Sequence, residues 1–260
     1  MEDALQGLLA YKTYAVALWF ALFFAGERLW SAARPGGAWR WDWARLGRNG
    51  GLWAINIASS VLIVLPATAL ATAHGLDWRP AWWRGWPGLL LDLVLLDLLI
   101  YWWHRANHEL PFLWRFHEVH HRDRFLDTTT ALRFHFGEVL LSACFRAVAI
   151  LLFAIPLVSV LAAETLLLVA TIFHHSNLRL PARLERALAR VVITPSIHWV
   201  HHHALKRDTD SNYGTVLSVW DVLFGSRNRT PRRLDMEIGV EATGELGFGG
   251  LVLRPFMSRR

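Results

Sequence analysis

Histidine is concentrated in the middle of the sequence. Twelve of the 13 histidines lie between His104 and His203, and most of them fall into three clusters with spacings of three or four residues. The clusters are His104–His108 (HxxxH), His117–His121 (HxxHH) and His198–His202 (HxxHH). Residues three or four apart share one face of a helix. Each cluster is therefore predicted to point its imidazoles in one direction, and neutral imidazoles that converge form a transition-metal site.

The number of donors favours two metal ions. The three clusters together offer at least eight imidazole nitrogens, whereas one tetrahedral zinc ion takes four ligands. Carboxylates are scarce within the clusters, so the pattern differs from the Glu-x-x-His sites of helical bundles. The single cysteine, Cys144, lies in an apolar run, which excludes a thiolate site built on paired cysteines. The residues alone leave iron, zinc and copper open.

A carboxylate precedes the first cluster on the same predicted helical face. Asp97, Tyr101, His104 and His108 follow an i, i+4, i+7, i+11 spacing. A carboxylate at membrane depth is expected to face the protein interior. Two interpretations are open: Asp97 accepts an imidazole N–H and orients the ring, or it pairs with an arginine and stabilises the bundle.

The elements that position these clusters are predicted to be membrane helices. Apolar residues make up 54% of the chain and are gathered into long runs, which is typical of a membrane protein. We expect an all-α integral membrane helical bundle that forms a single domain over residues 1–260. Three spans between residues 13 and 103 and one hairpin are predicted, at residues 13–30, 51–73, 88–103 and 139–175. The polar segments 104–138 and 176–260 then form a histidine-rich cap.

The predicted hairpin contains two charged residues. Arg146 and Glu164 stand at similar distances before and after Pro156. Because isolated charges are unfavourable inside a membrane, we expect the two side chains to lie at similar depth and to form an ion pair. Glu164 also shares a helical face with Thr171 and His175, so it could instead support the metal site.

Positive charge is placed beside the apolar runs. The net charge of +6 comes almost wholly from arginine, and the arginines flank the apolar segments without forming one dense patch. We therefore expect contact with lipid head groups and no nucleic-acid partner. Three crossings followed by a hairpin put all histidine clusters on one side, which also holds most of the arginines. The positive-inside rule then predicts clusters and C-terminus in the cytoplasm and the N-terminus outside, in a membrane such as a bacterial inner membrane.

The residues around the clusters resemble a known family. They are similar to the histidine boxes of the fatty acid hydroxylase / sterol desaturase superfamily of integral-membrane di-iron enzymes. The similar segments are Asp97–Arg105, Leu113–His121, Thr130–Glu138, His175–Pro181, Thr194–His202, Asn212–Gly214 and Trp220–Gly225. The resemblance covers roughly residues 90–226. Phe136 stands where that family usually has proline, and His174 and His203 stand where other residues are common, so we expect neither histidine to be a ligand.

The resemblance also implies roles for individual residues. It implies metal ligands at His104, His108, His117, His120, His121, His135, His175, His198, His201 and His202, with His135 either a ligand or a close neighbour. It further implies that Asp97 and Glu138 support the ligands from behind and that Asn177 lies near His175.

The activity implied by the resemblance is O2-dependent oxidation of an unactivated C–H bond in a membrane lipid, by hydroxylation or desaturation. Two iron ions are the implied cofactor, and zinc is possible in the isolated protein. Electrons must come from an external electron-transfer protein, because the sequence contains no flavin or NAD fingerprint. One alternative is a histidine-bound di-metal hydrolase or lyase acting on a membrane lipid. Another is a metal transporter or sensor, although transport sites usually lie near the midplane of the spans.

Overall fold

The computed structural model describes residues 7, 10–34 and 41–257. Within these residues the fold is helical throughout, and β-type pairing is limited to three isolated bridges, such as the one between Ser31 and Leu178. The prediction of an all-α fold is therefore confirmed.

Long helices form the body of the molecule. They are α2 (Lys12–Leu29), α3 (Trp43–Ser59), α4 (Leu65–Ala73), α5 (Gly85–Glu109), α7 (Phe136–Phe153) and α8 (Leu157–His175). A π-helical turn at Ser60–Val64 joins α3 and α4 into one continuous helix. The shorter elements are η3 (Ala81–Trp83), α6 (Pro111–His121), η4 (Thr128–Leu132), α9 (Ala182–Leu188), α10 (Pro195–His201), α11 (Lys206–Thr209), α12 (Val219–Leu223), α13 (Phe248–Leu253) and η5 (Arg254–Phe256).

Four helices are long and apolar enough to cross a membrane, which makes the chain an integral membrane helical bundle. They are Trp43–Ala73, Gly85–Glu109, Phe136–Phe153 and Leu157–His175. The first predicted span, 13–30, forms α2 but is not among the four, because this helix carries Lys12, Glu27 and Arg28. Glu27 is fully buried and accepts hydrogen bonds from Thr128 and Asn177. The end of α2 is thus tied to the polar cap.

The predicted hairpin is present as α7 and α8. The turn between them places Ala154 in the left-handed region (φ 49°), and Pro156 immediately precedes α8. Arg146 on α7 lies 3.7 Å from Glu164 on α8, which confirms the predicted ion pair. Lys12 of α2 approaches Glu164 at 4.0 Å. Glu164 therefore balances two cations and is not placed among the histidines.

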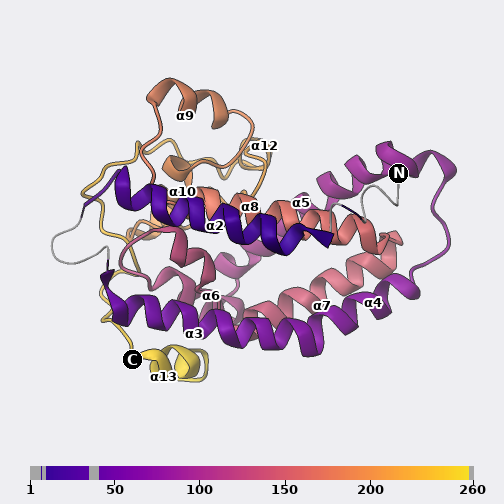
Figure 1. Ribbon diagram of the computed structural model, residues 1–260, viewed down its shortest axis with the longest axis horizontal. Helices are drawn as coiled ribbons and strands as arrows, with labels where there is room; N and C mark the ends of the chain where they lie inside the picture. Colours follow the sequence, from indigo (N-terminus) through magenta and orange to yellow (C-terminus); the bar gives the residue numbers. More distant parts are fainter. Residues whose placement is uncertain (1–6, 8–9, 35–40, 258–260) are drawn as a thin grey trace.

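The long helices run roughly side by side, and α6, α9, α10 and α12 gather at one end of the bundle (Figure 1). This end also receives the end of α5, the start of α7 and the end of α8, because consecutive long helices run in opposite directions. Buried apolar residues of α4, α5, α7 and α8 pack between the helices, including Leu96, Ile150 and Val160. The crossings of the bundle thereby bring the three histidine clusters to a common end.

A buried ionic network joins the bundle to the cap. The guanidinium of Arg45, on α3, donates hydrogen bonds of 2.6–2.9 Å to the carboxylates of Asp123 and Asp127. Burial by itself would raise the pKa of Asp123, but the charges of Arg45 and Arg133 lower it to about 2. The two carboxylates lie two and six residues after the second histidine cluster, so this network fixes the end of α6 against α3.

Replacement of Arg45 tests this connection. Arg45→Met removes the cation that is hydrogen-bonded to both buried carboxylates, and removing one partner of a buried ion pair typically costs about 3–5 kcal/mol. Arg48→Met is the matched control on the same helix, because Arg48 pairs with the half-exposed Glu245 and should contribute about 0–1 kcal/mol. Denaturation in mild detergent measures both free energies of unfolding; equal losses in the two variants would contradict the assignment.

Candidate metal centre

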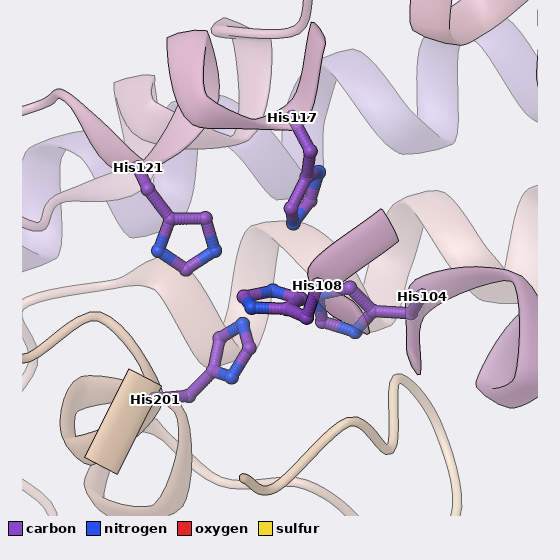
Figure 2. Close-up of side chains that lie close together, drawn as sticks. All are labelled: His104, His108, His117, His121 and His201. Atoms are coloured by element: carbon purple, nitrogen blue, oxygen red, sulfur yellow. The ribbon is translucent and has the colours of Figure 1, made fainter. Parts of the chain in front are cut away.

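Five histidines converge at the cap end of the bundle. His104 and His108 come from α5, His117 and His121 from α6, and His201 from α10. Each ring presents a nitrogen, and these atoms all lie within 4.8 Å of one another. Figure 2 shows the five side chains pointing toward a common centre from three directions. This set is called the five-histidine group below.

A second set of four histidines lies beside the first. His120 comes from α6, His175 is the last residue of α8, and His198 and His202 belong to α10 and its C-terminal end. The Nε2 atoms form a chain of close contacts, at 3.1 Å from His120 to His175, 3.0 Å from His175 to His198 and 3.1 Å from His198 to His202. This set is called the four-histidine group.

The close nitrogen contacts indicate what the four-histidine group can bind. Nδ1 of His120 donates to the carbonyl of Arg133 at 3.2 Å, and Nδ1 of His175 donates to the carbonyl of Thr171 at 2.8 Å. A neutral imidazole carries one N–H, so Nε2 of both rings presents a lone pair. Two lone pairs 3.1 Å apart repel each other. A metal ion held by both nitrogens would replace this repulsion with attraction.

In the five-histidine group, backbone carbonyls likewise orient two of the rings. Nδ1 of His104 donates to the carbonyl of Tyr213 at 2.8 Å, and Nδ1 of His201 donates to the carbonyl of Ser211 at 2.7 Å. Among the described residues, no hydrogen-bond partner is found for Nε2 of His117 and His201 or for either ring nitrogen of His108 and His121. Buried polar atoms are normally paired. These unpaired nitrogens are therefore consistent with metal ligands, because a bound metal would be their missing partner.

Burial keeps the cap histidines in the form that binds metal. Desolvation lowers the pKa of His201 to about 3, and it lowers the pKa values of His120, His121, His198 and His202 well below the usual range. Repulsion from neighbouring imidazoles acts in the same direction. The rings are therefore neutral at pH 7 and have lone pairs available, as a metal ligand requires.

Comparison with known proteins agrees with this geometry. Residues 89–226, more than half of the chain, match the profile described as fatty acid hydroxylase. The chain belongs to the fatty acid hydroxylase family. The resemblance seen in the histidine boxes is thereby confirmed.

Several family relatives are similar over large parts of the chain. Ornithine lipid hydroxylase OlsE of Rhizobium tropici is 28% identical over 207 residues, which cover 78% of this chain and 62% of the relative. Alkylglycerol monooxygenase of Danio rerio is 34% identical over 151 residues, covering 58% of this chain and 32% of the relative. The cholesterol 25-hydroxylase-like protein of Danio rerio is 28% identical over 186 residues, which cover 66% of this chain and 70% of the relative. The chain spans less than two thirds of the first two relatives, and no solved structure matches it.

Nine of the ten histidines that the sequence assigned to metal lie in the two groups. The tenth, His135, does not: its Nε2 donates to the carbonyl of Val252 at 2.9 Å, and its Nδ1 accepts the N–H of Gly137 at 2.9 Å. His135 caps the start of α7, so both nitrogens are used and the ring does not neighbour the metal groups. His174 and His203 also lie outside the groups, where they donate to the Thr215 carbonyl and the Asp208 carboxylate.

The three predicted supporting residues occupy different places. Glu138 accepts a hydrogen bond from Nδ1 of His117 at 2.8 Å, so it orients a member of the five-histidine group. Asp97 does not contact an imidazole; it accepts from the backbone N–H groups of residues 216 and 217 and from Nε1 of Trp220 at 2.7 Å. The Asn177 side chain bonds both backbone groups of Ala33. Asp97 and Asn177 thus hold loops of the cap and do not face the histidines.

The loop of residues 211–214 has a role in orienting histidines that the sequence did not predict. Residues 211–214 supply the carbonyls that orient His201 and His104. Asp221 fixes this loop by accepting hydrogen bonds from the backbone N–H groups of Tyr213 (2.7 Å) and Gly214 (3.0 Å). The sequence contains both motifs, Asn212–Gly214 and Trp220-Asp221. Only the fold shows that backbone carbonyls of this loop accept hydrogen bonds from two histidines.

Glu138 offers a test of ligand positioning in this fatty acid hydroxylase family member. Partners that orient a metal-bound histidine are typically worth about 10- to 100-fold in metal affinity, so Glu138→Ala should weaken metal binding by that factor. Glu138→Gln, which keeps an acceptor oxygen for His117, should lose less. Competition with a chelator measures the affinity. The control is Glu164→Gln, which removes a carboxylate that contacts no histidine; a similar loss there would refute the role of Glu138.

Proposed function

We propose that this chain is a membrane-bound di-iron oxygenase that hydroxylates a C–H bond of a lipid. The observation that supports this most directly is the pair of histidine groups, in which nine imidazoles crowd together at the end of an apolar helical bundle. Its membership in the fatty acid hydroxylase family supports the same assignment. The relatives' names describe hydroxylases and monooxygenases, which favours hydroxylation over desaturation.

The donor set fits two redox-active ions. Imidazole nitrogens suit iron, zinc and copper, and zinc has no redox chemistry. Because the histidine boxes resemble those of di-iron enzymes, we propose iron in both groups. When bound, two iron ions would supply the redox chemistry that activates O2 and breaks an unactivated C–H bond. The overall reaction takes one lipid C–H, O2, two electrons and two protons, and gives the lipid alcohol and water. The electrons are proposed to come from an external electron-transfer protein.

The chain's own residues hold and shield the reaction centre. The carbonyls of Ser211, Tyr213, Arg133 and Thr171 fix the imidazole rings, and Glu138 fixes His117. Eight of the nine histidines are buried and His104 is partly buried, so the protein shields most of the place where oxidation would occur from water. Because the groups lie where membrane helices end, a lipid can reach them while its tails stay in the bilayer.

The orientation follows from charge. We propose that the histidine end faces the cytoplasm, because arginines such as Arg124, Arg183 and Arg229 belong to that end and cytoplasmic loops carry excess Arg and Lys. This side also gives a soluble reductant access to the cap. A bacterial inner membrane fits the similarity to a hydroxylase of Rhizobium tropici.

Lipid analysis tests the activity. Cells that produce the chain should accumulate a lipid with one added oxygen, and labelled O2 should place its isotope in that lipid. His201→Ala and His198→Ala each remove one group member, and should lower the product at least about 100-fold, since even residues behind metal ligands contribute up to that factor.

His74→Ala is the matched control, because His74 is exposed and lies outside both groups. It should leave the product unchanged. A lipid product whose formation needs no O2, or which persists in both His198→Ala and His201→Ala, would refute the oxygenase assignment and favour hydrolase or lyase chemistry.

A further inference from the structure

A pocket on the cap opens beside the five-histidine group. Its volume is about 320 Å³, and its wall combines the end of α5, the start of α6 and residues from 204–210 and 239–241. His108 is part of this wall. Its side chain is fully buried, and neither ring nitrogen has a hydrogen-bond partner among the described residues. The pocket therefore connects the surface of the cap with one of the proposed metal ligands.

The charged residues of this pocket are mostly acidic. Glu109, Asp210 and Glu241 contribute three carboxylates, and Lys206 contributes one amine. Asp210 lies 3.4 Å from Nδ1 of His108 and 4.0 Å from the largely exposed Lys206. Glu109 pairs with Arg105, which is not part of the wall. Within the described part of the chain Glu241 has no ion pair. A negative hollow in a chain of net charge +6 favours a cationic ligand.

Apolar and aromatic residues lie next to these carboxylates. Pro111 and Trp114 line the pocket, and the neighbours of Pro111 in sequence, Leu110 and Phe112, are 52% and 60% exposed. Exposed apolar side chains next to a pocket can hold the hydrocarbon part of an amphiphile. The Trp114 ring packs against His108 with 5.1 Å between centroids, and an indole face attracts an ammonium group.

We propose that this pocket binds an ammonium-bearing head group of the lipid substrate, with Glu241 and Asp210 as its counter-charges. The proposal rests on the lipid oxygenase function and narrows the substrate to lipids with a free amine. A neutral head group gives Glu241 no counter-charge, and an anionic one is repelled by the carboxylates. The amine end of the lipid then lies beside the five-histidine group, and its tails extend along Leu110 and Phe112.

Binding to the purified full chain in a neutral detergent tests this assignment. The probe is a two-chain lysine lipid with a free ε-amine, compared with the same lipid acetylated on that amine. Charge-assisted contacts are markedly stronger than neutral ones, so the free amine should bind about tenfold tighter. Glu241→Gln should remove most of that preference. Glu237→Gln is the control, since this exposed carboxylate is four residues away and lies outside the pocket.

The possible outcomes distinguish a failure of the head-group pocket from a failure of the oxygenase assignment. Equal binding of the two lipids, or the same loss of preference in both variants, overturns the head-group assignment. Binding is measured without turnover. Selective, Glu241-dependent binding without any oxygenated product would therefore refute the oxygenase while retaining the binding site. An oxygenated product together with equal binding would refute the pocket alone.

Discussion

Repulsion between crowded imidazole nitrogens is the constraint on which this structure depends. In the four-histidine group, Nε2 atoms lie 3.0–3.1 Å apart while the other nitrogens of His120 and His175 donate to backbone carbonyls. Between His120 and His175, whose Nδ1–H groups are both used elsewhere, two lone pairs face each other, and only a shared cation makes that contact favourable. The bundle therefore has to hold the ends of the helices that carry these rings close together.

Rigid support for this arrangement comes from buried polar contacts behind the rings. Arg45 holds Asp123 and Asp127 just after α6, and Arg133 donates to the Val119 carbonyl within α6 while its own carbonyl accepts from His120. On the other side, Asp221 fixes the loop whose carbonyls accept from His104 and His201. Charged groups buried in this way are costly unless fully paired. Their role here is to keep a set of mutually repelling rings in one geometry.

Much of the site was predictable because helical spacing is a local property. The i, i+3 and i+4 patterns identified eight of the nine histidines of the two groups, and the family resemblance added His175. The hairpin and its Arg146–Glu164 pair followed from Pro156 and the cost of isolated charges. The division into two groups was not predictable from spacing alone. Adjacent His120 and His121 belong to different groups, since neighbouring residues on a helix point about 100° apart. His135 and Asp97 were misplaced because their partners, Val252 and residues 216–220, are distant in sequence.

The number of metal ions per chain tests the central claim most directly. Protein purified from iron-supplied cells, in mild detergent and without added chelator, is expected to contain two metal ions per chain by elemental analysis. Replacement of His108, in the five-histidine group, or of His198, in the four-histidine group, should each reduce that content by about one, because each group is expected to hold one ion. Fully active wild-type protein with a single ion per chain, or with none, would contradict it.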